Sequence, residues 1–274
     1  MNDALLGRTA LVTGAGRGIG RSIALGLAAD GARVALLARS VDQLAEVAAA
    51  VSAAGGTALV VPTDVGDPES VKQAVALVLA EFGAVDILVN DAAVVAPLGP
   101  TATVDANIWA AALAVNVVGP FRLAQAVLPG MIARGWGRIA NVSSAIAAHP
   151  AAMIGMNAYA ASKSALEAHT LNLAAELAGT GVTVNVYRPG SVDTAMQGWI
   201  RSQPADEIGV ALHERFIESY ERGSLLTPDQ SARSLLERMA GDATGQVWNV
   251  EEHDDRRRRL DTWCRLEPHD FFSS

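Results

Sequence analysis

The sequence predicts an α/β protein: a doubly wound parallel sheet of about seven strands with helices on both faces. Short apolar runs alternate with longer Ala- and Leu-rich stretches along most of the chain. Strands that alternate with helices form parallel sheets through right-handed crossovers. Most of the runs lack the polar alternation of a half-exposed strand, as expected where helices cover both faces of a sheet.

The apolar runs give the predicted strands in chain order. They span 9–13, 33–38, 57–63, 85–90, 137–144, 182–187 and 246–250. Helical stretches at 20–31 and 68–83 end near glycines, which commonly terminate helices. A further helical stretch spans 164–179. The pattern weakens over about 194–226, interpreted as a helical insertion, and again after Val250. We therefore expect one domain over 1–250 and a C-terminal tail over 251–274.

The composition restricts the class of protein. Half of the 274 residues are hydrophobic and 18% are charged, which is typical of a compact domain. A net charge of -8 argues against a nucleic-acid-binding protein. The only cysteine, Cys264, excludes an intrachain disulfide. Charged positions interrupt the apolar stretches and the N-terminus lacks the order of a secretion signal, so we expect no membrane span and a cytoplasmic location.

A glycine-rich turn follows the first predicted strand. Glycines occupy positions 14, 16, 18 and 20, and a helical stretch comes next. Glycines let a backbone approach a pyrophosphate, whose charge is favoured at a helix N-terminus. Alone, such a cluster is more simply a turn without a ligand. Its place between the first strand and the first helix favours dinucleotide binding.

The end of the second predicted strand bears on the choice of dinucleotide. NAD-binding sites of this kind place an acidic residue there to bind the ribose 2′-hydroxyl. Here Ala38 is followed by Arg39, which can pair with a 2′-phosphate, and Arg17 in the glycine turn can reach the same side. The sequence thus predicts NADP(H). NAD(H) is the alternative, with both arginines merely exposed.

Tyr159 and Lys163 are four positions apart, so they share one face of a helix. A phenol ordinarily keeps its proton up to about pH 10. A protonated lysine nearby favours the phenolate and would lower the tyrosine pKa toward neutrality, as acid–base catalysis requires. By itself, the pair is more often two ordinary residues on a helix surface.

Taken together, these motifs resemble those of the short-chain dehydrogenase/reductase family over roughly residues 5–250. The family's T-G-x-x-x-G-x-G matches 13–20, its Y-x-x-x-K matches 159–163, and its P-G-x-V-x-T matches 189–194. Its serine matches Ser144 in N-V-S-S, its helix asparagine matches Asn116, and its adenine-contacting aspartate matches Asp64. The resemblance implies a Rossmann fold.

The resemblance also implies roles. Tyr159 would be the general acid in carbonyl reduction and the base in alcohol oxidation, and Lys163 would lower its pKa and bind the nicotinamide ribose. Ser144 would donate to the substrate oxygen, and Asn116 would hold a water that links Lys163 to solvent. The implied cofactor-binding residues are Gly14, Gly16, Arg17, Gly18, Ile19, Gly20, Arg39, Asp64, Val65, Asn90, Ala92, Tyr159, Lys163, Pro189, Gly190, Val192 and Thr194.

The sequence departs from the family pattern at three places. The family's N-N-A-G reads N-D-A-A at 90–93, so Asp91 brings a charge, although Asn90 still fits the cofactor-facing position. Ser144 and Tyr159 are 15 positions apart (159 − 144), about two more than expected, so 149–156 would bulge over the substrate mouth. Ser143 is an alternative to Ser144. The Asp-Gly-Gly that often follows the last strand is replaced by EEHDD.

We therefore expect an NADP(H)-dependent oxidoreductase that interconverts a carbonyl and a secondary alcohol. The alternatives are a non-catalytic NADP-binding sensor or scaffold on the same fold, and an NAD-dependent alcohol dehydrogenase. We expect an apolar small-molecule substrate beneath a lid at 194–226, although its apolar side chains are equally consistent with ordinary packing. The family resemblance implies a homodimer or homotetramer through helices that include 105–130 and 158–178. The histidines lack metal-ligand spacing, so no metal is expected.

Overall fold

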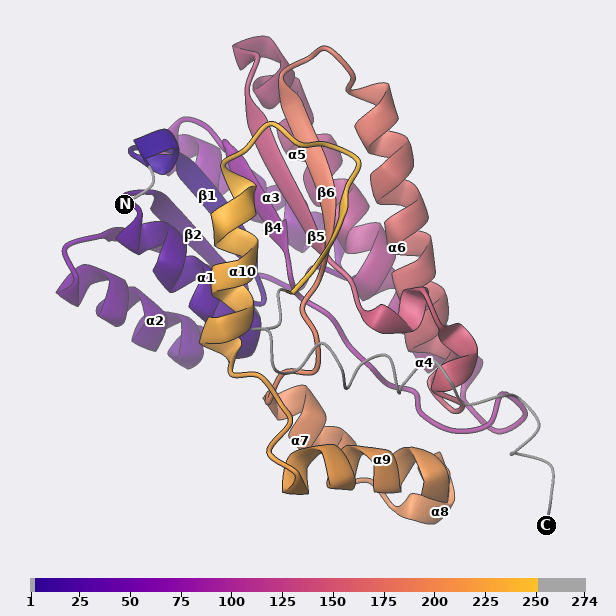
Figure 1. Cartoon of the computed structure of the whole chain (residues 1–274). Coiled ribbons are helices and arrows are strands. Elements are labelled where there is room, and N and C mark those ends of the chain that lie inside the picture. The colour runs from indigo at the N-terminus through magenta and orange to yellow at the C-terminus, as the bar shows by residue number, and fades with distance from the viewer. Residues whose placement is uncertain (1–2, 251–274) are drawn as a thin grey trace.

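Seven strands form one parallel sheet in the computed structural model, which describes residues 3–250 (Figure 1). The strand order is β3-β2-β1-β4-β5-β6-β7, and every neighbouring pair is parallel. The predicted fold class is confirmed, and each predicted strand end lies within two residues of an observed one. The strands are β1 Thr9–Thr13, β2 Arg33–Ala38, β3 Thr57–Pro62, β4 Ile87–Asn90, β5 Gly137–Val142, β6 Val182–Arg188 and β7 Val247–Asn249.

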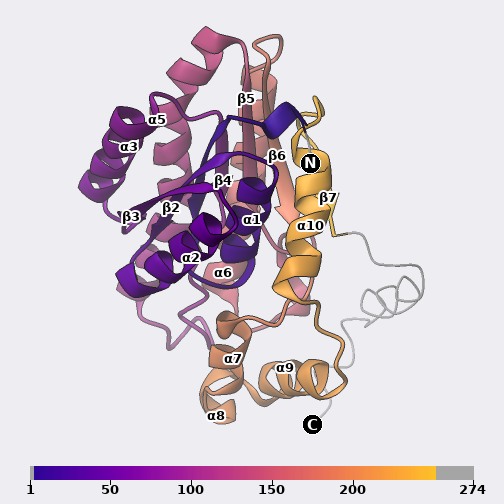
Figure 2. The ribbon, with the colours of Figure 1, turned by 90° about the vertical axis from the view of Figure 1, so that its left-hand side faces the viewer.

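Helices cover both faces of the sheet (Figure 2). One face carries α1 (Gly18–Ala29), α2 (Val41–Ala53) and α10 (Pro228–Met239), and the other carries α3 (Pro68–Phe82), α5 (Gly119–Arg134) and α6 (Asn157–Glu176). Helix α6 begins before Tyr159, so the Tyr159–Lys163 pair lies inside the helix and not ahead of it. The predicted tail at 251–274 lies outside the described residues.

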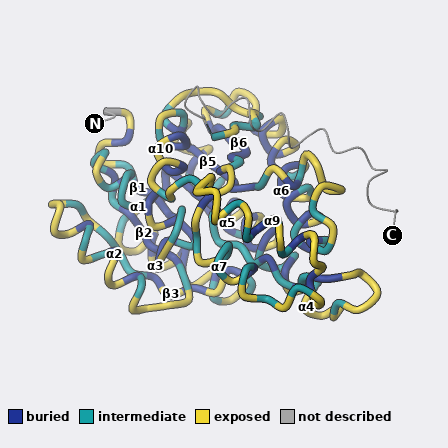
Figure 3. The backbone as a smooth tube through the Cα atoms, turned by 60° about the horizontal axis from the view of Figure 1, so that its bottom comes forward, coloured by how far each residue is buried: buried dark blue, intermediate teal, exposed yellow. Residues whose placement is uncertain are grey.

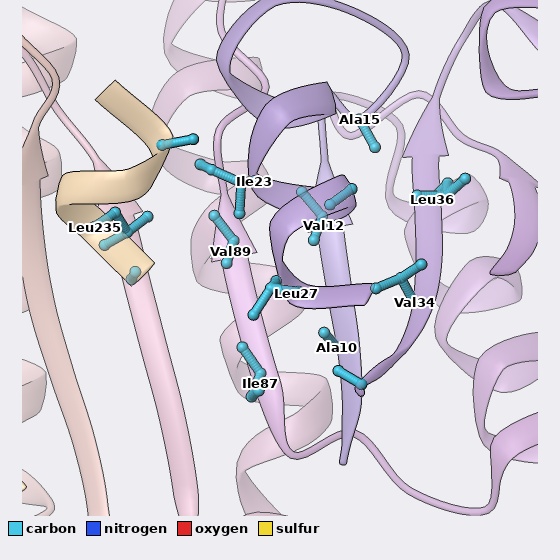
Figure 4. Packing of buried hydrophobic residues seen from close by; sticks show 14 of the residues in the cluster. Ala10, Val12, Ala15, Ile23, Leu27, Val34, Leu36, Ile87, Val89 and Leu235 are labelled. Atoms are coloured by element: carbon cyan, nitrogen blue, oxygen red, sulfur yellow. The ribbon is translucent and has the colours of Figure 1, made fainter. Parts of the chain in front are cut away.

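Alternate residues of the central strands enter two separate cores. In β1, Ala10 and Val12 face α1 and α10, while Leu11 faces α3 and α5. Figure 4 shows the first core, where Ile23 and Leu27 of α1 lie over the strands. Burial on both faces explains why these strands are apolar throughout.

The edge strands differ from the central ones. All five residues of β1 are buried, whereas both ends of β3 are exposed and β7 is only partly buried. Figure 3 shows the buried strands inside a shell whose outward-facing residues are exposed. The inner strands are therefore more deeply buried than the edge strands.

The predicted insertion forms three short helices beyond the carboxyl end of β6 (Figure 1). They are α7 (Ala195–Arg201), α8 (Ala205–Ile208) and α9 (Val210–Glu221). A parallel bridge between Val192 and Leu226 closes the base of this segment. We call residues 194–226 the lid, because this segment lies beyond the carboxyl edge of the sheet.

Residues 106–134 form a single long helical run made of α4 (Ala106–Leu113), a π-helical turn at Ala114–Val118, and α5. By length and composition alone it is apolar enough to cross a membrane, because Arg122 is the only charge before Arg134. The sequence-based expectation that charges interrupt every such stretch is therefore wrong here. The run packs against α3, α6 and β5, as the core helix of a doubly wound sheet does.

Candidate active site

A cavity of about 360 Å³ opens at the carboxyl edge of the sheet. Ligands of open α/β sheets bind in this crevice, where the direction of the strand order reverses, here between β1 and β4. The volume falls within the range of small-molecule sites, about 300–1,000 Å³. Its wall holds these predicted site residues: Gly14, Gly16, Arg17, Gly18, Ile19, Arg39, Asp64, Val65, Ala92, Tyr159, Lys163, Pro189 and Thr194.

The glycine turn needs glycine for two reasons. Gly14 and Gly18 have φ of 67° and 57°, a left-handed conformation that other residues rarely adopt. A methyl group on Gly14 would also come within 3.1 Å of the backbone nitrogen of Ala92, closer than an ordinary contact. The turn therefore presents bare backbone at the N-terminus of α1. This cradle fits the pyrophosphate of a dinucleotide.

Other predicted residues lie behind the cavity wall. Asn90 is 3% exposed, and its amide donates to Asn141 Oδ1 of β5 at 2.8 Å. It thus ties β4 to β5 beneath the site. Gly20 lies inside the glycine turn, where a methyl group would meet the Gly14 oxygen at 2.5 Å. Gly190 and Val192 pack against Leu226 at the base of the lid.

Tyr159 and Lys163 lie together on the cavity wall, and Ser144 lies next to Tyr159. The Ser144 hydroxyl forms a hydrogen bond with the Tyr159 phenol. Lys163 is 2% exposed; its Nζ donates to the Val142 oxygen at 2.7 Å and lies 5.5 Å from the centre of the Tyr159 ring. A hydroxyl, a phenol and an ammonium group are therefore held together by β5, the loop after it and α6.

The electrostatics of Tyr159 differ from the expectation. Burial raises the pKa of the phenol above its ordinary value, the charge of Asp91 raises it further, and the hydrogen bond with Ser144 lowers it. The predicted lowering of the Tyr159 pKa is wrong in this structure, because burial and the charge of Asp91 outweigh the hydrogen bond with Ser144. At neutral pH the phenol therefore keeps its proton.

Burial lowers the pKa of Lys163 to about 8, while the charges of Asp91 and Glu167 oppose that shift. The ammonium form therefore predominates below about pH 8. Asp91 and Glu167 both act on Lys163, so the net charge of the site depends on the protein groups around each of these carboxylates.

Asn116 lies in the π-helical turn between α4 and α5, a feature often found at functional sites. Its amide donates to the Val94 oxygen at 2.8 Å and to Ser162 Oγ at 3.0 Å, and its oxygen accepts from the Val94 N–H at 2.9 Å. Both amide donors are therefore used by the protein. A water held by this side chain would have to donate to its remaining acceptor site.

Ser143 and Ser144 point to different partners. Ser143 is 2% exposed, and its hydroxyl donates to Glu167 Oε1 at 2.7 Å. Arg188, the last residue of β6, donates to both oxygens of Glu167, at 2.9 and 2.7 Å. Ser144 alone reaches Tyr159. The sequence left the two serines as alternatives, and their hydrogen bonds separate them.

Sequence reasoning missed several groups at the site. Ser40 and Gln43 join Arg39 on the wall at the end of β2, and Val94 and Val115 also line the cavity. Asp91 also lies on the wall, and Glu167 lies one helical turn beyond Lys163. The i, i+4 spacing of Lys163 and Glu167 could have signalled the second carboxylate. Among residues 3–250, His, Cys, Asp and Glu form no group able to hold a metal ion.

The chain resembles known proteins over most of its length. Residues 8–205 match a family model described as short chain dehydrogenase. A short chain dehydrogenase of Pseudocercospora fijiensis is 40% identical over 234 residues, which cover 85% of this chain and 73% of that protein.

Solved structures agree with that match. An actinorhodin polyketide ketoreductase with NADPH superposes with a TM-score of 0.80 at 33% identity, covering 89% of this chain and 95% of its own. An NAD+-bound xylitol dehydrogenase has a TM-score of 0.80 at 28% identity, covering 90% and 98%. Similar structures thus bind either dinucleotide, so they do not decide the cofactor preference of this chain.

Proposed function

The chain belongs to the short-chain dehydrogenase/reductase family of nicotinamide-dependent oxidoreductases, and on that premise we propose that it reduces a carbonyl to a secondary alcohol with NADPH. One observation carries the proposal: Tyr159, which Ser144 contacts by a hydrogen bond, and Lys163 lie on the wall of a cavity whose other walls include the glycine cradle. A proton donor and a dinucleotide cradle in one cavity are what such a reduction requires.

Tyr159 is the proposed proton donor to the substrate oxygen. The phenol is protonated at neutral pH, as the donor in a reduction must be, whereas oxidation needs the phenolate as base. The Ser144 hydroxyl, next to the phenol, donates a second hydrogen bond as negative charge develops on the substrate oxygen. The nicotinamide supplies the hydride when it is bound. Lys163 is charged below its pKa of about 8 and stabilises the phenolate that remains.

The proposed preference for NADPH rests on the charge at the end of β2. Arg17 and Arg39 both line the cavity, and Ser40 and Gln43 line it beside them. No carboxylate stands at the end of this strand to repel a 2′-phosphate. An Arg39→Asp variant should lose most of its preference for NADPH over NADH, measured as the ratio of kcat/KM for the two cofactors. An unchanged ratio would contradict this assignment.

The proposed substrate is an apolar carbonyl compound. Tyr159 packs against a cluster contributed by the loop after β4, the segment 146–156 and the lid, which includes Val95, Ile146 and Phe216. Ala195 and Met196 of the lid line the cavity, so the lid contributes apolar surface to the site. An apolar group next to the substrate carbonyl could be buried there without leaving a charged side chain of the protein unpaired.

We also propose self-association through α5 and α6. Their outer faces leave large apolar side chains exposed, among them Phe121 at 46% and Leu171 at 41%. Exposed apolar patches of this kind commonly mark protein interfaces. The mass of the purified protein in solution would test this.

The decisive experiment compares the intact protein with a Tyr159→Phe variant, using NADPH and a panel of apolar ketones. The variant should bind NADPH and reduce ketones about 10²–10⁴-fold more slowly, since general acid catalysis contributes that much. Tyr220→Phe, which alters an exposed phenol of α9, is the matched control and should leave turnover unchanged. NADPH binding without turnover of any ketone by the intact protein would instead favour a sensor.

A further inference from the structure

Asp91 places a carboxylate directly against the glycine cradle. Its backbone N–H and that of Ala92 both donate to Thr13 Oγ1 at 3.0 Å, which pins the turn after β4 to the end of β1. The carboxylate accepts a hydrogen bond from the N–H of Gly20, in the first turn of α1. A methyl group on Gly20 would lie 2.7 Å from Asp91 Oδ2, and one on Gly14 3.1 Å. Both glycines make room for this side chain.

This is the place that a dinucleotide pyrophosphate would approach. Asp91 lines the same cavity as Gly14, Gly18 and Ile19, at the N-terminal end of the 12-residue helix α1. The backbone N–H groups at such an end attract negative charge. The chain therefore supplies one anion of its own beside the cradle that would receive another. Like charges this close cannot both stay ionised without cost.

The charged and titratable groups around Asp91 come from three elements. Helix α6 contributes the ammonium of Lys163 and the phenol of Tyr159, which both interact electrostatically with Asp91. The glycine turn contributes Arg17 on the cavity wall, and α1 contributes the Gly20 N–H. Burial raises the pKa of Asp91 to about 7, and Lys163 and Gly20 oppose that shift. Near neutral pH the side chain thus exists in both forms.

Building on the proposed function, we propose that binding of the dinucleotide protonates Asp91, so that the complex takes up a proton from solution at this carboxylate. The pyrophosphate adds negative charge beside Asp91 and excludes water from it, and both changes favour the neutral carboxyl group. The proton comes from the buffer and stays on the side chain while the cofactor is bound. Cofactor affinity consequently falls as pH rises above the pKa of Asp91 in the free protein.

The test is calorimetry of NADPH binding at about pH 7.5 in two buffers whose ionisation enthalpies differ, which yields the number of protons taken up. The intact protein should take up roughly 0.7 proton or more per cofactor, because about three quarters of Asp91 is ionised there. The Asp91→Asn variant keeps the shape of the side chain and removes its titrating carboxyl group. Glu81→Gln, which alters an exposed carboxylate of α3, removes the same charge elsewhere and should behave as the intact protein.

Lys163 also titrates in this range, so both measurements are repeated with Lys163→Arg, which keeps the positive charge and does not lose its proton. In that background, uptake should be roughly 0.7 proton while Asp91 is present and close to zero once Asp91→Asn is added. As a second measurement, the Kd for NADPH is determined between about pH 6 and pH 8. Over this range the Kd of the intact protein should increase about tenfold more than the Kd of the Asp91→Asn variant.

The outcomes separate the two proposals. Equal proton uptake with and without the Asp91 carboxylate, or parallel pH dependences of Kd, would overturn the role of Asp91 while leaving the NADPH-dependent function intact. Failure of the intact protein to bind NADPH would overturn the proposed function, and the role of Asp91 with it. Binding is measured from the heat released or absorbed and not from turnover, so a variant with low activity gives an equally clear result.

Discussion

Glu167 and Asp91 both act on the ammonium of Lys163, yet the structure surrounds them differently. Glu167 receives two hydrogen bonds from Arg188 and one from Ser143. Asp91 has the Gly20 N–H and the charge of Lys163. We call Ser143, Glu167 and Arg188 the support cluster, and Thr13, Gly20 and Asp91 the cradle cluster.

The difference teaches what each carboxylate can do. A buried carboxylate with a bidentate arginine fixes the elements that it joins, here β5, α6 and the end of β6. A partly buried carboxylate without an arginine is poorly compensated, so its burial shifts its pKa toward neutrality. The support cluster therefore holds the site in place, and the cradle cluster can respond to a ligand.

The largest effect is expected from breaking the support cluster. Glu167→Ala leaves Arg188, whose side chain is 18% exposed, without its partner, and should lower the free energy of unfolding by about 3–5 kcal/mol. Urea denaturation measures the loss. The double variant Glu167→Leu with Arg188→Met removes both charges and should be less destabilised than Glu167→Ala. A loss below about 1 kcal/mol in the single variant would mean that the pair is not structural.

An opposite effect is expected in the cradle cluster. The raised pKa of Asp91 means that its ionisation destabilises the fold: the penalty is absent below the ordinary pKa of 3.8, grows as pH rises, and is complete above about pH 7. Asp91→Asn should therefore stabilise the protein by about 2 kcal/mol at pH 8, allowing for partial exposure, and by less at pH 5. Thermal unfolding at the two pH values measures this. A stabilisation by Asp91→Asn that did not grow with pH would contradict the raised pKa assigned to Asp91.

The smallest effect distinguishes two adjacent serines. Ser143→Ala removes one of the three hydrogen bonds to Glu167 and should cost about 1 kcal/mol of stability with little change in turnover. Ser144→Ala should do the reverse, because its hydroxyl faces Tyr159 and holds the Ile146 N–H only at 3.4 Å. Unfolding midpoints and kcat, measured side by side, test the contrast. Equal effects of the two variants on stability and turnover would contradict the assignment of Ser143 to the support cluster and of Ser144 to the catalytic groups.

Local sequence features were enough for much of the fold and part of the site. The strands at 9–13 and 33–38 were predicted with their observed bounds, since each is a continuous apolar run at the sheet centre. Tyr159 and Lys163 share a helix face because their spacing matches the helical period. The glycine cradle followed from its place after the first strand. These features depend on residues close together in the chain.

Features that depend on distant residues were not predictable in the same way. The Asn90 amide was expected to face a cofactor, but it binds Asn141 beneath the cavity, 51 positions away in sequence. The contact of Asp91 with Gly20 also joins separate elements. The apolar run at 106–134 resembles a membrane span until its packing against the sheet is known.

The sequence by itself determined the alternation of strands and helices, the cradle and the Tyr159–Lys163 pair, because spacing and hydrophobic pattern act over a few residues. Only the tertiary structure decided that Tyr159 holds its proton more tightly than a free phenol, that Ser144 and not Ser143 reaches it, and that Glu167 is paired with an arginine while Asp91 is not. The physical reason is that a pKa and a buried hydrogen bond depend on which groups burial brings together, and those groups come from elements far apart in the chain.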